Sequence, residues 1–212
     1  MRQLLRNGLR ARRRGALIDA YFHTHDFPKL QLGAGEHPHD GWLNTDLHGY
    51  GRSDELVYLD VRKPFPLPDG SFDFVYSEHM IEHLTYAEGQ HCLRESLRVL
   101  KPGGRIRVAT PSLERLAALY DGGEAAESYI QWAVETLEPE VKASLAGVVI
   151  NNFFRSWGHR FVYDPETLSY ALREAGFVGI AEAPLGELEQ HLAETPEFNR
   201  LETFVLEAER AH

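Results

Sequence analysis

Three residues in the stretch 77–84, SEHMIEHL, have the types and the spacing of a metal-dependent hydrolase site. His79, Glu82 and His83 match the H-x-x-E-H pattern of inverted zinc metallopeptidases. In such a site the two histidines bind the metal and the glutamate activates a metal-bound water. This chemistry requires both histidines to project from one continuous helix. The elements on either side of the motif therefore decide whether it can act in this way.

Those elements place the motif in a turn. The apolar stretch 71–77, SFDFVYS, is typical of a strand, and Thr85 with Glu88 forms a capping box that begins a helix. The motif therefore lies between the carboxyl end of a strand and the start of the next helix. The sequence identifies no third ligand, although histidine pairs at 23 and 25 and at 37 and 39 are available. We predict no bound metal and retain a zinc hydrolase as an alternative.

Length and composition indicate one globular domain. The chain has 212 residues, of which 43% are hydrophobic, and this is enough for a single full core across residues 1–212. Cys92 is the single cysteine, which excludes an intramolecular disulfide and fits a reducing compartment. No stretch has the length and apolarity of a signal peptide core or of a membrane span. We therefore expect a soluble, cytoplasmic protein.

Charge is distributed unevenly along the chain. The formal net charge is −10, yet the first fourteen residues hold six arginines and no acidic residue. Residues 1–22 predict a basic amphipathic helix that packs on the domain, and contact with an anionic membrane surface or partner is a second interpretation. The acidic remainder argues against nucleic-acid binding, because binding phosphates requires clustered lysines and arginines.

Short strands and helices alternate along the rest of the chain. Strands are predicted at 29–35, 42–47, 55–61, 71–77, 105–110, 178–183 and 201–209. Helices are predicted after the N-caps Thr85 and Asp164, and residues 120–164 form a helical insertion that ends in a loop. This pattern is typical of a doubly wound α/β sheet, mostly parallel with an antiparallel closing strand. The ligand of such a sheet lies at the carboxyl ends of its strands.

Two stretches carry a family resemblance. LDVRKPFPLPDGSFDFVYSEHMIEHL, residues 59–84, is followed by CLRESLRVLKPGGRIRVATPS, residues 92–112. In order and in spacing they resemble the core of the class I S-adenosylmethionine-dependent methyltransferases, in particular the broad type 11 group. The resemblance covers residues 29 to 110 well and the later part of the chain more loosely. It implies a Rossmann-like methyltransferase sheet with S-adenosylmethionine as cofactor.

The resemblance also implies roles for residues at the ends of four strands. Gly33 and Gly35 would form the turn beneath the methionine part of the cofactor, where glycine allows a close backbone approach. Asp46 would accept hydrogen bonds from the ribose hydroxyls, and Asp60 with the Val61 amide would bind adenine. The residues that would face the sulfonium and the incoming nucleophile are Ser77, Glu78 and His79.

The first two crossovers of this chain are shorter than the family pattern. The segments 34–41 and 47–54 are too short for full crossover helices, which make a βαβ connection a dozen or more residues long. We expect the N-terminal segment to cover the face that those helices would protect. The missing helix also argues against a nicotinamide dinucleotide fold, which requires a third glycine opening a long helix.

The segment 150–164, INNFFRSWGHRFVYD, is predicted to be a substrate loop or lid, because it is rich in aromatic and polar residues without a clear period. Asn152, Arg155 and Arg160 are its candidate substrate-binding residues. Guanidinium groups suit a carboxylate, a phosphate or a sugar-linked anion. The acceptor is therefore predicted to be a small molecule or a saccharide rather than nucleic acid.

Together these features predict methyl transfer from S-adenosylmethionine to a small-molecule acceptor, at oxygen. His79 is the predicted general base, with Glu82 orienting it and His159 as a second candidate base. The competing interpretation is a non-catalytic module of the same fold that only binds or assembles. Binding of S-adenosylhomocysteine distinguishes the two.

Overall fold

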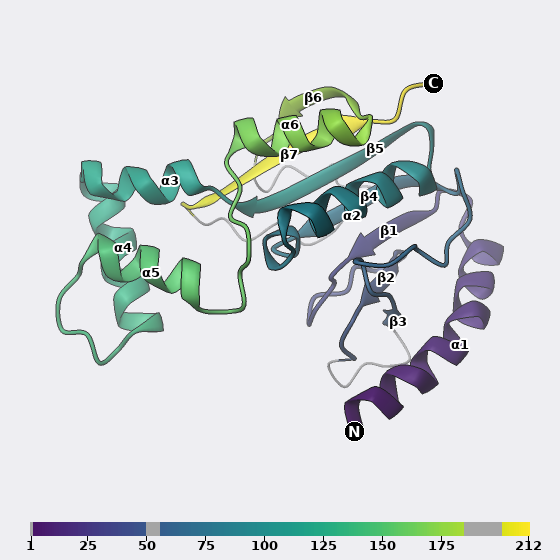
Figure 1. Ribbon diagram of the computed structural model, residues 1–212, viewed down its shortest axis with the longest axis horizontal. Helices are drawn as coiled ribbons and strands as arrows, with labels where there is room; N and C mark the ends of the chain where they lie inside the picture. Colours follow the sequence, from purple (N-terminus) through teal and green to yellow (C-terminus); the bar gives the residue numbers. More distant parts are fainter. Residues whose placement is uncertain (1, 50–55, 185–200) are drawn as a thin grey trace.

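The computed structural model describes residues 2–49, 56–184 and 201–212 of the chain (Figure 1). Its centre is a seven-stranded sheet with the order β3-β2-β1-β4-β5-β7-β6. The strands are β1 (Lys29–Leu32), β2 (Leu43–Asp46), β3 (Val57–Tyr58), β4 (Phe72–Glu78), β5 (Leu100–Pro111), β6 (Val178–Glu182) and β7 (Thr203–Glu209). The five strands from β3 to β5 pair in parallel, whereas β7 pairs antiparallel with both β5 and β6. The predicted fold class is confirmed.

The central strands are buried on both faces, as expected for parallel strands covered by other elements. All four residues of β2 are buried, and so are five of the seven in β4. Helices α2 (Tyr86–Val99) and α6 (Pro165–Ala175) pack against each other over the sheet (Figure 1). Their predicted caps are present: Thr85 and Glu88 form the capping box of α2, and Asp164 accepts a hydrogen bond from the Thr167 amide.

The first crossovers are as short as the sequence predicts. Residues 33–42, between β1 and β2, contain no helix, and β2 is joined to β3 through only residues 47–56, of which 50–55 lie outside the described part. Helix α1 (Arg2–Thr24) lies beside β3 at the open side of the sheet (Figure 1). Its residues Ile18 and Tyr21 enter the main hydrophobic core. The N-terminal helix thus supplies part of the cover that the crossover helices would give.

The insertion forms a helical lobe at one end of the sheet (Figure 1). It contains α3 (Leu113–Ala117), the 3₁₀ turn η2 (Ala118–Asp121), α4 (Glu124–Leu137) and α5 (Ala146–Arg155). The lobe has a hydrophobic core of its own, formed by Leu116, Leu119, Ala126, Ile130, Ala133, Val134, Val149 and Phe153. The prediction of a loop from residue 150 is wrong as far as Arg155. Val149, Asn152 and Phe153 are buried at helical spacing, which favours a helix there.

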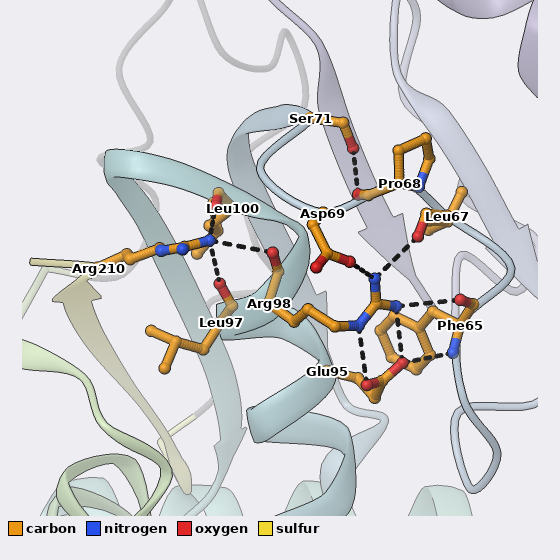
Figure 2. Close-up of polar contacts among 10 residues, drawn as sticks. All are labelled: Phe65, Leu67, Pro68, Asp69, Ser71, Glu95, Leu97, Arg98, Leu100 and Arg210. Carbon is orange, nitrogen blue, oxygen red and sulfur yellow. Dashed lines mark hydrogen bonds and ion pairs between the residues drawn. The ribbon is translucent and has the colours of Figure 1, made fainter. Parts of the chain in front are cut away.

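The two stretches that carry the family resemblance, 59–84 and 92–112, contact each other at the C-terminal end of α2 (Figure 2). The Arg98 guanidinium donates to the carbonyls of Phe65 and Leu67 and to the carboxylates of Asp69 and Glu95. Glu95 in turn accepts a hydrogen bond from the Phe65 amide. This network fixes the turn that leads from the end of β3 to β4.

A second arginine closes the same end of the helix. The Arg210 guanidinium, just past β7, donates to the carbonyls of Leu97, Arg98 and Leu100 (Figure 2). These are carbonyl groups at a helix C-terminus, which lack intrahelical partners.

Among the described residues, no helix is both long enough and apolar enough to pass through a membrane.

Candidate functional site

The glycine turn after β1 brings its backbone close to a neighbouring side chain. Gly33 and Gly35 have φ of +68° and +56°, a conformation that favours glycine. A Cβ atom added at Gly33 would lie 2.4 Å from Cγ and 2.8 Å from Cβ of Met80, whereas at Gly35 it would meet no atom within 4 Å. Gly33 is therefore required both by its backbone conformation and by the contact with Met80.

Asp46, the last residue of β2, is buried and organises the turns around it. Its Oδ2 accepts a hydrogen bond from the Gly35 amide at 3.0 Å, and its Oδ1 accepts one from the His48 amide at 2.6 Å. An ionised carboxylate offers about four lone-pair sites, so it can also accept hydroxyl donors. Asp46 thus links the glycine turn to the end of β2.

Asp60, which follows β3, is buried and paired with Arg62. Arg62 Nε and a terminal nitrogen donate to the two carboxylate oxygens at 2.8 and 3.0 Å. This hydrogen bonding lowers the pKa of Asp60 below its usual value, despite the opposing effect of burial. Asp60 is therefore a fixed negative charge at this edge of the sheet.

Two adjoining cavities lie at the carboxyl ends of the strands. The first, here the Asp46 cavity, has a volume of about 400 Å³ and is lined by Gly33, Gly35, Asp46, Leu47, His48, Leu59, Asp60, Val61, Arg62, His79, Met80, His83, Leu84 and Trp157. The second, the His159 cavity, measures about 430 Å³ and is lined by Gln31, Gly33, Ala34, Gly35, His37, Glu78, His79, Glu82, His83, Phe153, Trp157 and His159. Gly33, Gly35, His79, His83 and Trp157 line both cavities, so the two cavities share a wall.

His79 stands between the two cavities in an unusual backbone conformation, with φ of +45°. Its amide donates to the Ala109 carbonyl at 3.0 Å, which anchors it to β5. Its Nδ1 lies 3.3 Å from Glu82 Oε1, and its Nε2 lies 3.1 Å from Thr203 Oγ1. The ring is therefore held between a carboxylate and a hydroxyl, and these contacts fix its orientation.

Glu82 is completely buried beneath His79. Its Oε2 accepts a hydrogen bond from Thr110 Oγ1 at 3.0 Å. Burial raises the pKa of Glu82, but the interaction with His79 outweighs it, and the net pKa lies below the usual value. The backbone carbonyl of Glu82 accepts the Arg160 and Phe161 amides, at 2.8 and 3.2 Å, and so holds the segment after α5 against the motif.

His159 comes from that segment and faces His83. Its Nδ1 is 2.8 Å from the Phe153 carbonyl, and the two imidazole rings meet edge to face with centroids 4.9 Å apart. Burial lowers the pKa of His159, which favours its neutral form. One ligand atom from each of Glu82, His83 and His159 lies within 4.8 Å of the other two.

The structure gathers most of the predicted site residues but separates some from the cavities. Ser77 is buried within β4 and lines neither cavity. Asn152 and Arg155 line another hollow, of about 590 Å³, in the helical lobe. Arg160 pairs with Glu88 at 2.6 Å and also lines neither cavity. The roles proposed for these residues stay predictions.

Several residues of the site carry no local signal that identifies them. Thr203 reaches His79 only because β7 pairs with β5. Gln31 and His37 line the His159 cavity through the short β1–β2 connection. The exposed Trp157 lines both cavities, and the only sequence signal for it is the S-W-G turn that follows α5.

Known proteins resemble both the sequence and this architecture. Residues 43–108 match a family model described as a methyltransferase domain. The match covers less than half of the chain, and it includes β2, the motif and α2. The predicted resemblance is thus confirmed over residues 43–108.

Among curated proteins, the chain is similar to the ubiquinone/menaquinone biosynthesis C-methyltransferases UbiE of two Pseudomonas species. The protein from P. fluorescens is 32% identical over 126 residues, and that from P. entomophila is 31% identical over 131 residues. Each match covers 58% of this chain and 44% of the relative. The chain therefore spans less than half the length of these relatives.

Solved structures share the fold. A SAM-dependent methyltransferase from Archaeoglobus fulgidus has a TM-score of 0.56 at 17% identity, covering 95% of this chain and 92% of its own. An S-adenosylmethionine-dependent methyltransferase from Mesorhizobium loti has a TM-score of 0.52 at 18% identity, covering 92% of this chain and 96% of its own. The predicted cofactor, S-adenosylmethionine, is the one named for both structures.

Proposed function

We propose that this protein transfers the methyl group of S-adenosylmethionine to a small-molecule acceptor. The observation that supports the proposal is the wall that the two cavities share, which includes Gly33, His79 and Trp157. A cofactor in the Asp46 cavity would border the His159 cavity directly. The acceptor therefore has a separate space beside the cofactor, as a two-substrate transfer requires.

The residues of the Asp46 cavity fit this cofactor. Gly33 leaves no room for a side chain at the turn, and Asp46 offers carboxylate oxygens beside the turn amides. Asp60 and Val61 also line this cavity, and the adenine would lie beside them. When bound, S-adenosylmethionine supplies a methyl group on a positively charged sulfur that acts as a good leaving group. Acidic residues at this edge suit that positive charge.

The His159 cavity offers groups that accept a proton from the acceptor. His79 is our candidate base, because it lines both cavities and contacts the buried carboxylate of Glu82. An acceptor hydroxyl would lose its proton to the imidazole as its oxygen takes the methyl group. Both nitrogens of His79 have partners in this state, so this role requires the contact with Thr203 to open or to relay the proton.

The acceptor atom has two candidates. We propose oxygen, because imidazoles suit proton removal from a hydroxyl near neutral pH. The UbiE relatives are named C-methyltransferases, and this favours an acidic carbon as the second candidate. Neither Arg155 nor Arg160 lines the His159 cavity, so its lining gives no support to an anionic or saccharide acceptor.

Calorimetric titration with S-adenosylhomocysteine tests the cofactor half of the proposal. We expect micromolar binding at the wild-type cavity. Absence of binding at millimolar ligand would contradict it. Binding without release of S-adenosylhomocysteine from S-adenosylmethionine across a panel of hydroxylated and enolisable compounds would favour the non-catalytic module.

His79→Ala tests the acceptor half once such a panel identifies an acceptor. General-base catalysis typically contributes about 100- to 10,000-fold, so turnover should fall by that factor while cofactor affinity is retained. His23→Ala, which removes an exposed histidine of α1, is the matched control. Full turnover in folded His79→Ala protein would transfer the role to another histidine of the cavity.

A further inference from the structure

A three-residue cluster in the wall of the His159 cavity has the composition of a metal site. Glu82 and His83 come from the motif turn, and His159 comes from the segment after α5. One ligand atom of each lies within 4.8 Å of the other two. His159 supplies a third group of ligand type, from a segment distant in sequence from the motif. The two segments are fixed together by the hydrogen bonds from the amides of residues 160 and 161 to the Glu82 carbonyl.

The hydrogen bonding of His159 prepares one ring nitrogen for a metal. A backbone carbonyl only accepts hydrogen bonds, so the contact with Phe153 places the proton of His159 on Nδ1. The lone pair is then on Nε2. Metal-binding histidines typically donate their other ring nitrogen to a carbonyl or carboxylate in this way, and the partner fixes both tautomer and orientation.

The buried carboxylate supplies a second, independent observation. Glu82 is fully buried and lines the cavity, and its Oε1 makes no hydrogen bond within the described structure. His79 Nδ1, at 3.3 Å, is an ion-pair neighbour without hydrogen-bond geometry. Thr110 holds only Oε2. Oε1 therefore has the ion-pair contact with His79 but no hydrogen bond, and a metal cation beside this buried oxygen would compensate its charge more fully.

We propose that Glu82, His83 and His159 bind a divalent transition-metal ion of the Zn²⁺ type, with an open coordination position toward the His159 cavity. Two histidines and one carboxylate are a ligand set of catalytic zinc sites, in which the fourth position is left to water or substrate. With metal–ligand distances of about 2.0–2.1 Å, tetrahedral ligand atoms lie about 3.4 Å apart. The observed limit of 4.8 Å requires the half-exposed imidazoles to move inward by about 1 Å.

This ligand set differs from that of the peptidase pattern. In the H-x-x-E-H pattern the glutamate activates water and both histidines of the motif bind the metal. Here Glu82 belongs to the cluster, and the ring of His79 lies between Glu82 and Thr203. The cluster therefore does not favour a hydrolase.

The open position suits an oxygen donor, and this assignment rests on the proposed methyl transfer. An acceptor hydroxyl bound there would have a lowered pKa, because a divalent cation stabilises the alkoxide or phenolate form. The metal site therefore narrows the proposed acceptors to compounds with a metal-binding hydroxyl, such as an enol, a phenol or a vicinal diol. His79 lies beside the cluster, where it can take the released proton.

The test uses Zn²⁺ and Co²⁺ alone as probes. Purified protein is stripped with a chelator and titrated with ZnCl₂ by calorimetry, and Co²⁺ binding is followed by its visible absorption. The variants are His83→Ala and His159→Ala. His37→Ala is the control, because His37 lines the same cavity outside the cluster. Circular dichroism and thermal melting establish that each variant is folded.

We expect one Zn²⁺ per chain for the wild type and for His37→Ala, and an affinity at least about tenfold weaker in each ligand variant. If His159→Ala fails to fold, His83→Ala decides, because its half-exposed ring lies on the surface turn. Equal zinc binding by the wild type and His83→Ala would overturn the site. Stripped protein that binds S-adenosylhomocysteine but no zinc would refute the metal alone, whereas loss of cofactor binding would refute the proposed function instead.

Discussion

Replacing Asp46 with alanine tests the cofactor site most directly, because this carboxylate has two separable roles. In the structure it accepts the amides of Gly35 and His48, one on each oxygen. In the proposed complex it would also accept the two ribose hydroxyls. Asp46→Ala should therefore change both the free energy of unfolding and the affinity for the cofactor.

The two magnitudes follow from the hydrogen bonds that are lost. Hydrogen bonds to a charged group contribute about 1.5–3 kcal/mol each, and the partly exposed turns favour the lower value. Loss of the two amide contacts should lower the free energy of unfolding by about 3 kcal/mol, which leaves an ordinary domain folded. Loss of two ribose contacts of the same strength should weaken S-adenosylhomocysteine binding about a hundredfold, since 1.4 kcal/mol is a factor of ten.

Urea denaturation measures the first quantity, and calorimetric titration under native conditions measures the second. Asp40→Ala is the matched control, because it removes an exposed aspartate from the same β1–β2 connection. A folded Asp46→Ala protein with wild-type affinity would remove Asp46 from the cofactor site and leave it only the structural role. Unchanged stability would refute the estimate for the amide contacts.

Two further predictions concern the frame of the site. Gly33→Ala should destabilise the protein more than Gly35→Ala in thermal melting, because both have positive φ but only Gly33 would collide with Met80; adding Met80→Ala should recover part of the difference. Arg98→Met should lower the free energy of unfolding by about 2–3 kcal/mol near neutral pH. The hydrogen bond from Arg98 is the main cause of the lowered pKa of Glu95, so this contribution is present above the usual glutamate pKa of about 4.3. This part of the gap is lost as pH falls through the lowered value, whereas the hydrogen bonds from Arg98 to the Phe65 and Leu67 carbonyls persist. A stability gap that does not narrow in acid would contradict the ion pair.

The fold and the candidate cofactor edge are predictable because local patterns mark them. Asp46 ends the short second strand, Asp60 follows the third, and glycines follow the first. In a parallel sheet the carboxyl ends of neighbouring strands lie at one edge, so positions far apart in sequence meet there without any long-range signal. The shortened crossovers are also readable from segment length, since a helix needs more residues than 34–41 provide.

The acceptor side is not predictable in the same way, because it depends on contacts between distant segments. Thr203 lies 124 residues from His79 and meets it through the antiparallel pairing of β7. Arg160 is a plausible anion-binding residue in the sequence, yet it pairs with Glu88, the residue that also completes the capping box of α2. A polar residue in a loop therefore has several possible partners, and which one it contacts depends on the tertiary structure.

The Asp46 cavity and the His159 cavity are formed by different parts of the fold, and we expect their roles to be separate for this reason. The Asp46 cavity is formed by strand ends whose positions are set by the register of the buried sheet. The aromatic wall of the His159 cavity comes from α5 and the segment after it, which contacts the motif through two amides on the Glu82 carbonyl. Because the helical lobe has its own core, its sequence can change without altering the strand ends. Acceptor selection is therefore expected to lie in the lobe, through Phe153, Trp157 and His159, while the sheet edge determines the cofactor.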